Sequence, residues 1–461
     1  MKKDSIAKND GFRTRWGFIM ACIGSAVGMA NIWRFPNLVA TYGGLTFLIP
    51  YFLFVVLIGS TGVMEEFAFG RWAGAGPMTA FGKATQERWG KKAPGEAIGV
   101  LPVIGAMGLA VGYSVVMGWI FKYAFMAFDG RLAAMGQDMD VIVSAFNATA
   151  PEADTIGGSI SAVLGGAGND LWIIVAVAVS FVIMALGVAR GIEVSCKFMM
   201  PILFGLFLVL AVYIGFLPGA KDGYKYILTL DPAGLLNGEV WIYAFGQAFF
   251  SLSVAGNGSV IYGAYLNKEV EIPSSARNVA VFDTIAALLA AFVIIPAMAT
   301  TGAKLDAGGP GLMFIYLVNV FNGMTGARLI GIVFFLCVLF AGVSSLINLY
   351  ETPVAFLQEK LHMKRVPAVA LIHAVGALIA VFIQAYASRW MDIISIYICP
   401  LGAFLAAVMF FFVLKKDTAM RAVSMGCEKP VGSWLYWIGK LVFCPLCVFC
   451  LVAGILLGGI G

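Results

Sequence analysis

The chain has 461 residues, of which 61% are hydrophobic and only 12% are charged, and its mean hydropathy is +0.92. These values are typical of a protein that crosses a membrane several times, and they exclude an ordinary soluble globular domain. The net charge of +5 is interpreted as a signal of membrane orientation, so nucleic acid is not expected as a partner.

Long hydrophobic stretches predict eleven membrane-spanning helices, since a helix needs about 20 apolar residues to cross the bilayer. In chain order, the spans are expected at about 15–40, 44–70, 98–127, 171–189, 195–217, 240–265, 276–302, 327–357, 366–387, 391–414 and 434–459. The segment 129–170, between the third and fourth spans, is acidic and rich in Gly and Ala. It is long for a loop, so we expect short helical structure there.

The distribution of basic residues predicts the orientation of the chain. Residues 1–14 form a polar tail that contains Lys2, Lys3 and Lys8, and most of the 30 Lys and Arg residues fall on the same side as this tail. The positive-inside rule therefore predicts a cytoplasmic N-terminus, and eleven spans would leave the C-terminus outside. The first span is too long for a cleavable signal peptide and contains Arg34. The expected location is the bacterial cytoplasmic (inner) membrane.

The first and sixth spans are each interrupted by Gly and short polar residues. The first interruption is Gly24-Ser-Ala-Val-Gly-Met-Ala-Asn31, and the second is Ser251-Leu-Ser-Val-Ala-Gly-Asn-Gly258. Each unpaired backbone group in hydrocarbon costs several kcal/mol, so a helix that unwinds there needs another partner for these groups. We therefore expect both helices to break around a bound ligand. A helix-packing face of small residues is the alternative explanation for the first interruption.

The two interruptions occupy equivalent places if the chain contains two repeats, at about 15–217 and 240–414. Each repeat would cross the membrane five times, so the second would have the opposite orientation. Inverted repeats with discontinuous helices are typical of transporters that work by alternating access. We therefore predict an all-α membrane protein with two inverted five-helix repeats and discontinuous first and sixth helices. Residues 15–461 would form a single transporter domain that includes an extra helix at about 434–459.

Residues that support other chemistries are scarce. The chain has only two His residues and contains no Walker, Rossmann or nucleophile-elbow motif. The sequence Cys444-Pro-Leu-Cys447 resembles a redox or metal motif, but it lies in an apolar span without a His or an acid near it in the sequence. We interpret these cysteines as structural. The sequence therefore predicts neither an enzyme nor an organic cofactor.

Several ordered motifs resemble those of the neurotransmitter:sodium symporter family, in particular its bacterial branch. The segment from Gly24 to Pro36 is similar to the family's first-helix signature. The further matches are Tyr42-Gly-Gly to Ile49-Pro-Tyr51, Glu66 with Gly70-Arg71, Tyr113 with Trp119, Gly191-Ile-Glu193 with Lys197 to Pro201, Val240-Trp241 through Gln247 to Tyr265, and Ala341-Gly-Val-Ser-Ser345. The resemblance extends over essentially the whole chain.

This resemblance implies two sodium sites built from backbone and side-chain oxygens. The residues of the first site would be Ala26, Asn31, Ser251 and Asp283. The residues of the second site would be Gly24, Val27, Ala341, Ser344 and Ser345. The carboxylate of the substrate would complete the first site, which would couple sodium binding to substrate binding. Hydroxyl bonding within one helix is the alternative role for the two serines, and structural bonding to a neighbouring helix is the alternative for Asp283.

The resemblance also implies a substrate pocket between the two interruptions. Its residues would be Ala26, Met29, Ala30, Leu109, Tyr113, Phe250, Ser253, Gly256, Ser345 and Leu349. Tyr113 would bind a carboxylate and would form an outer lid together with Phe250. Arg34 would pair with Asp392 to close the outer vestibule. Core packing is the alternative role for Phe250, and anchoring at the membrane interface is the alternative for Arg34.

Three departures from the family pattern bear on the cargo. Family members that transport monoamines carry an acid at the position of Gly28, so glycine favours substrates that bring their own carboxylate. Many members carry a bulky pocket residue at the position of Gly256. Gly256 and the following Asn257 suggest a larger or more polar region for the substrate side chain, which leaves the identity of the substrate open. Animal members bind chloride near an Asn and a Ser of span seven, where this chain has Asp283 and Ala287. This built-in carboxylate predicts chloride-independent transport. A buried carboxylate is costly when it is ionised without sodium, so we raise the hypothesis that it returns protonated, which would give proton counter-transport.

The predicted function is sodium-coupled import of a neutral amino acid by alternating access, with two sodium ions and no chloride. Two charges crossing 100 mV release about 4.6 kcal/mol, which concentrates a zwitterion on the order of a thousandfold. The alternatives are transport of another zwitterion, such as a β- or γ-amino acid or an amino sulfonate, and a membrane ligand sensor without transport. Glu66, Gln247 and Glu193 are assigned to supporting networks.

Overall fold

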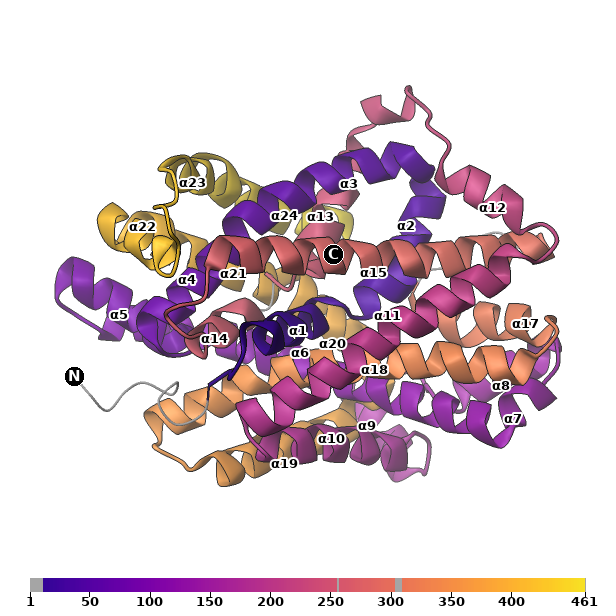
Figure 1. Ribbon diagram of the computed structural model, residues 1–461. Helices are drawn as coiled ribbons and strands as arrows, with labels where there is room; N and C mark the ends of the chain where they lie inside the picture. Colours follow the sequence, from indigo (N-terminus) through magenta and orange to yellow (C-terminus); the bar gives the residue numbers. More distant parts are fainter. Residues whose placement is uncertain (1–10, 255–256, 303–308, 461) are drawn as a thin grey trace.

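The computed structural model describes residues 11–254, 257–302 and 309–460 (Figure 1). These residues contain helices and connecting segments and no β-strand. Seven of their helices are long and apolar enough to cross a membrane, and one further pair, bent at a break, would make eight. The predicted all-α membrane fold is confirmed, whereas the count of eleven crossings and the inverted relation of the two repeats stay predictions.

The helices of the first predicted repeat begin and end near the expected span boundaries. They are α1 (Arg15–Ala26), η2 (Ala30–Arg34), α2 (Phe35–Tyr42), α3 (Gly44–Ile58), η3 (Gly59–Val63), α4 (Met64–Ala73), α5 (Pro77–Trp89), α6 (Ala93–Asp129), α10 (Asp170–Ala185), η4 (Val188–Ile192) and α11 (Glu193–Gly215). The connection after α6 contains the short helices α7 (Arg131–Ala134), α8 (Met139–Asn147) and α9 (Ile156–Leu164), as expected. The sequence did not predict α5, because its charged residues exclude it from the spans.

The second half of the chain also consists of helices and short connections. Its helices are α12 (Ala220–Ile227), η5 (Gly234–Leu236), α13 (Gly238–Ser251), α14 (Gly258–Ala264), α15 (Ile272–Thr301), α16 (Gly309–Gly311), η6 (Leu312–Tyr316), α17 (Leu317–Asn322), α18 (Ala327–Lys360), α19 (Arg365–Ile383), η7 (Gln384–Tyr386), α20 (Ala387–Ile393), η8 (Ile394–Ile398), α21 (Cys399–Val408), η9 (Met409–Val413), α22 (Lys416–Ser424), α23 (Trp434–Ile438), η10 (Gly439–Phe443) and α24 (Cys444–Leu457).

The bundle is elongated, and its two ends carry different elements. α5 and α22 lie at one end, while α8, α12 and α17 lie at the opposite end (Figure 1). The long helices α6 and α18 pack along each other. Glycines on α6 let α20 and η8 come close, because a Cβ at Gly112 would lie 2.2 Å from the Met391 sulfur and a Cβ at Gly108 would lie 2.6 Å from Ile394. This close packing places Met391 directly against α6.

Both predicted interruptions are real breaks in the helices. α1 ends at Ala26, Val27 is extended, and the helix that resumes at Ala30 is bent by 56° relative to α1. In the second break, between α13 and α14, Ser253 and Asn257 have positive φ angles of 58° and 51°. Such angles cost a non-glycine residue on the order of 1 kcal/mol or more. The prediction that the first and sixth spans are discontinuous is confirmed.

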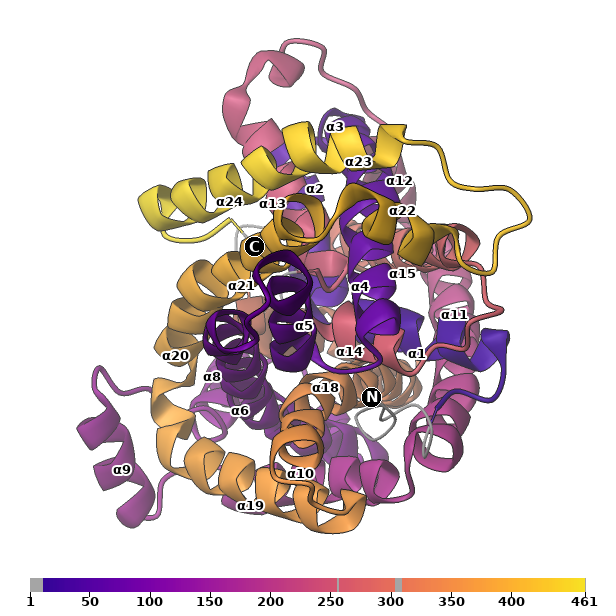
Figure 2. The same cartoon turned by 90° about the vertical axis from the view of Figure 1, so that its left-hand side faces the viewer.

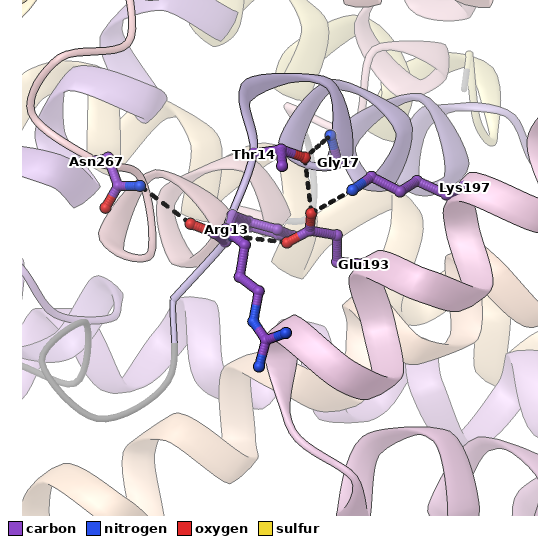
Figure 3. Close-up of polar contacts among 7 residues, drawn as sticks. Arg13, Thr14, Gly17, Glu193, Lys197 and Asn267 are labelled. Carbon is purple, nitrogen blue, oxygen red and sulfur yellow. Dashed lines mark hydrogen bonds and ion pairs between the residues drawn. The ribbon is translucent and has the colours of Figure 1, made fainter.

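The segment before α1 is fastened to α11 through the Glu193 carboxylate (Figure 3). This carboxylate accepts hydrogen bonds from the Arg13 backbone N–H at 2.7 Å, the Thr14 hydroxyl at 2.7 Å and the Lys197 ammonium at 2.6 Å. Asn267, which follows α14, binds the backbone carbonyl next to Arg13. The start of the broken first helix is therefore held by elements from both halves of the chain, which agrees with a supporting role for Glu193.

Replacing Glu193 by Gln is expected to loosen this attachment and to lower the free energy of unfolding by about 2 kcal/mol, since hydrogen bonds to a charged group are worth about 1.5–3 kcal/mol. Thermal unfolding of the purified protein in detergent measures the effect. The matched control is Glu152→Gln, the same change in an exposed loop residue, which should leave the melting temperature unchanged. Equal melting temperatures for both variants would contradict the role assigned to Glu193.

Candidate functional site

A cavity of about 260 Å³ lies between the two helix breaks, with α6, α18 and the α20–η8 region as its other walls. The lining residues are Ser25, Ala26, Gly28, Met29, Ala30, Trp33, Arg34, Leu109, Tyr113, Val116, Phe250, Ser253, Gly258, Ser345, Asn348, Leu349, Met391 and Ser395. Nine of the ten predicted substrate residues belong to this set. The tenth, Gly256, lies outside the described residues. The structure therefore gathers into one cavity residues that the sequence placed up to about 320 positions apart.

One part of the cavity wall is formed by unwound backbone and hydroxyl groups. The Met29 N–H donates a hydrogen bond to the Tyr113 hydroxyl oxygen at 3.1 Å, and the Ser253 hydroxyl donates to the Ser25 carbonyl at 2.8 Å. Gly28 precedes Met29, and a Cβ there would lie 2.9 Å from both the Tyr113 and the Ser345 hydroxyl oxygens. An acidic side chain at this position would fill the space next to Tyr113. The wall is therefore polar but carries no built-in carboxylate at this point.

A buried polar cluster adjoins the cavity and contains three residues of the first predicted sodium site. The Asn31 amide nitrogen lies 2.8 Å from one carboxylate oxygen of Asp283 and 3.0 Å from the Ser251 hydroxyl. The Ser251 hydroxyl donates to the other carboxylate oxygen of Asp283 at 2.7 Å. All three side chains are completely buried. The fourth predicted ligand, Ala26, ends α1 and lines the cavity.

This cluster suits a small hard cation. Carboxylate and hydroxyl oxygens, which Asp283 and Ser251 contribute here, are ligands that such cations prefer. The side-chain contacts described for the Asp283 carboxylate are with Asn31 and Ser251, neither of which is a cation. A buried carboxylate in a membrane is costly without a positive charge or a proton. Its surroundings therefore favour binding of a cation beside it.

The residues of the second predicted site also lie together. The Ser345 hydroxyl lies 3.3 Å from both the Gly24 and the Val27 carbonyl oxygens, so it joins α18 to the first break. The Ser344 hydroxyl instead donates to carbonyls of its own helix, including Ala341 at 3.0 Å. Gly24 permits the close approach of α1 to α18, because a Cβ at this position would lie 2.8 Å from the Ser344 Cβ. Ser344 therefore lies beside the first break, as predicted for the second site, but its hydroxyl shows the alternative role of bonding within its own helix.

The predicted gate residues surround the same cavity. Phe250 and Tyr113 line it from α13 and α6, and Arg34 lines it from η2. Asp392 directly follows the lining residue Met391 in α20. The pairing of Arg34 with Asp392 and the action of these residues as gates stay predictions.

Sequence reasoning missed some of the cavity residues, of which Asn348 is the most informative. It is 2% exposed, and its amide nitrogen lies 3.3 Å from the Gly258 carbonyl, across the second break. Helical spacing could have found it, because Asn348 follows Ser344 and Ser345 by one turn on α18. Gln247, which was assigned to a supporting network, donates to the Ala30 carbonyl at 3.1 Å and thus binds the first break.

A second polar network, which the sequence did not reveal, lies between α18 and α19. Arg365 binds both carboxylate oxygens of Glu351 at 2.9 Å, and the Tyr265 hydroxyl donates to the same carboxylate at 2.5 Å. Tyr265 follows α14, so this network connects the broken sixth span to α18. No local sequence pattern pairs these residues, because each contact joins different helices.

Comparisons with known proteins agree over nearly the whole chain. A model of the sodium:neurotransmitter symporter family matches residues 9–145 and 155–457. A relative from Methanocaldococcus jannaschii, described as an uncharacterised sodium-dependent transporter, is 29% identical over 454 residues and covers 95% of this chain and 89% of its own length. The sodium-dependent transporter YhdH of Bacillus subtilis is 32% identical over 350 residues, which are 76% of this chain and 72% of YhdH.

A solved structure is also similar over nearly the whole chain. It is the crystal structure of MhsT in complex with L-phenylalanine, which matches with a TM-score of 0.78 at 29% sequence identity. The match covers 96% of this chain and 99% of the MhsT chain.

Proposed function

The chain belongs to the sodium:neurotransmitter symporter family, and from this premise we propose that it imports a neutral amino acid together with sodium by alternating access. Membership makes it a multi-pass, sodium-dependent membrane transporter and not an enzyme. The observation that carries the finer proposal is the cavity between the two helix breaks, which adjoins the buried cluster of Asn31, Ser251 and Asp283. MhsT, the similar solved structure, has L-phenylalanine as its bound molecule.

The arrangement of the groups supports a zwitterionic cargo with two sodium ions. The substrate carboxylate would lie near the Met29 N–H and the Tyr113 hydroxyl, where Gly28 leaves room for it. One sodium ion would bind beside Asp283, where Asn31 would turn its amide toward the ion and give up the hydrogen bond that its oxygen accepts from the Gly28 N–H at 3.0 Å. The second would bind between the Ser345 hydroxyl and the carbonyls of the first break. A carboxylate shared by substrate and sodium would make the two bind cooperatively.

The role proposed for Asp283 includes independence from chloride. The cluster already contains a carboxylate, and the helix position one turn later is the small residue Ala287. We propose the bacterial cytoplasmic membrane as the location, with the N-terminus inside, because most Lys and Arg residues fall on that side. α5 and α22 lie at the same end of the bundle, and their basic residues Lys83, Arg88, Lys416 and Arg421 support placing that end in the cytoplasm (Figure 1).

Sodium gradients should drive accumulation of a labelled neutral amino acid into proteoliposomes that contain the purified protein. Replacing external sodium by choline should abolish accumulation, whereas replacing chloride by gluconate should leave it unchanged. A panel of unlabelled zwitterions, including β- and γ-amino acids and amino sulfonates, identifies the preferred cargo by competition. Equal accumulation in choline, or saturable binding without any counterflow, would contradict the proposed symport.

Replacing Tyr113 by Phe is expected to raise the half-saturating substrate concentration at least about tenfold, since a lost hydrogen bond to a charged group is worth about 1.5–3 kcal/mol. The sodium dependence should remain, because Tyr113 is not a proposed sodium ligand. Uptake at varied substrate concentration measures the change. The control is Tyr123→Phe on the same helix, where the buried hydroxyl has no described hydrogen-bond partner. Unchanged saturation in Tyr113→Phe would remove Tyr113 from the proposed carboxylate site.

A further inference from the structure

A second hollow, of about 1070 Å³, opens on the outside of the bundle between α3, η3 and α15. Both walls belong to helices that are long and apolar enough to cross a membrane. Its apolar lining includes Val56, Val281 and Ile285, which are 69%, 48% and 39% exposed. In a multi-pass membrane protein, this part of the groove faces the hydrocarbon of the bilayer. Its natural occupant there is an alkyl chain.

One end of the groove is strongly polar and carries charges of both signs. It is lined by Glu271, Ser274 and Arg277 at the start of α15, and by Glu428 and Lys429 in the segment that follows α22. Cys427 also lines this groove, and burial, together with the Glu271 carboxylate, raises the pKa of its thiol. Two cations and two carboxylates therefore meet where the apolar groove ends.

The polar end is held in place by Arg71, which is only 7% exposed. Its guanidinium donates to the Val270 carbonyl at 2.5 Å, to Ala422 at 3.0 Å and to Met425 at 2.8 Å. The segment that carries Glu428 and Lys429 is thus fastened to the segment that precedes α15. Figure 2 shows α22 beside α4, from which Arg71 comes, with α15 close to both. The groove and its charged end are therefore formed before any ligand binds.

The charges at this end are available to an external partner. Arg277, Glu428 and Lys429 form no ion pair with any residue that the structure describes. The Glu271 carboxylate accepts one hydrogen bond, from the Ser274 hydroxyl at 3.0 Å, and Ser274 also accepts one from Arg15. A ligand with both a negative and a positive group can therefore satisfy this end without displacing an existing ion pair.

We propose that this groove binds one membrane phospholipid whose headgroup carries a phosphodiester and a primary ammonium. One acyl chain lies along Val56 and Val281, the phosphate lies between Arg277 and Lys429, and the ammonium lies beside Glu428. An anionic lipid without an ammonium would leave the carboxylates facing its phosphate. A quaternary ammonium could not donate hydrogen bonds to them. The combination of charges therefore favours an ethanolamine headgroup over glycerol or choline headgroups.

Native mass spectrometry of the detergent-purified protein tests this assignment. The protein is mixed with equal amounts of phosphatidylethanolamine, phosphatidylglycerol and phosphatidylcholine that share the same acyl chains. One ethanolamine lipid per chain should be retained at least about fivefold more than either competitor. Retention should fall at least about fivefold in Arg277→Ala/Lys429→Ala. The matched control Lys364→Ala/Lys415→Ala removes two exposed cations outside the groove and should retain the ethanolamine lipid as the wild type does.

A second variant tests the apolar part of the groove independently of the headgroup. Val56→Trp places a large side chain where the acyl chain would lie, and it should reduce retention of all three lipids. Each variant is used only if it elutes as a single species and melts like the wild type before lipid is added. Preferential retention of phosphatidylglycerol, equal retention of all lipids, or a second copy of the chain in place of lipid would each overturn the proposal.

Discussion

The Asp283→Asn variant is expected to lose sodium-driven uptake almost completely. Asn has the same shape as Asp and can keep hydrogen bonds with Asn31 and Ser251, so the fold should survive. The cluster would lose its only carboxylate, however, and removing one partner of a buried charge pair costs about 3–5 kcal/mol. We expect the half-maximal sodium concentration to rise at least about a hundredfold. Uptake at varied sodium concentration and sodium-dependent thermal stabilisation both measure this change.

A double variant separates the loss of charge from a general loss of structure. Asp283→Asn/Ala287→Ser replaces the built-in carboxylate by the residue types that accompany chloride in animal members of the family. It should recover sodium-driven uptake in chloride but not in gluconate, because an external anion would then supply the missing charge. Recovery without chloride would show that the carboxylate does not substitute for an anion. Normal sodium dependence in Asp283→Asn itself would remove this residue from the sodium site.

The Ser345→Ala variant is expected to show the second largest loss of transport. Its hydroxyl is the only described side-chain group within 3.3 Å of both the Gly24 and the Val27 carbonyls. Without it, a sodium ion at the second site loses one ligand, and the half-maximal sodium concentration should rise at least about tenfold. The Ser344→Ala variant should have a smaller effect, because that hydroxyl already bonds to carbonyls of its own helix. Sodium titrations of uptake compare the two variants.

The matched control for both serines is Ser114→Ala. Ser114 is completely buried in α6, and its hydroxyl lies 2.9 Å from the Tyr350 hydroxyl, outside both proposed sodium sites. This variant should keep the wild-type sodium dependence even if it is somewhat less stable. A larger loss in Ser344→Ala than in Ser345→Ala would reverse the roles assigned to these hydroxyls. Similar sodium dependence in all three variants would place the second ion elsewhere.

Local sequence patterns determined the positions of the long helices and of both breaks. The spans were visible because lipid demands long uninterrupted apolar segments, and the breaks were visible because Gly and short polar residues contradict that demand. The breaks at Val27 and at Ser253–Asn257 lie where the pattern predicted them. The short helices of 129–170 were expected, whereas α5, α12 and α22 were not, since their charged residues resemble those of connecting loops.

The composition of the site was predictable only through the resemblance to a family. The resemblance suggested the partners Asn31 and Asp283, which are 252 positions apart, and Gly24 and Ser345, which are 321 positions apart. Neither hydrophobic periodicity nor residue spacing carries information over such distances. Asn348 lies on α18 just beyond the matched motif Ala341-Gly-Val-Ser-Ser345, and it received no role from the sequence.

The sequence by itself determined that this chain lies in a membrane as a bundle of helices, and where two of those helices must open. Only the tertiary structure decided which side chains share the cavity, how Glu351 and Arg365 join α18 to α19, and how Arg71 holds together the segments that line the charged end of the outer groove. The reason is physical. Helices and their breaks depend on backbone hydrogen bonding and burial within one segment, whereas these contacts depend on how separate helices pack against one another.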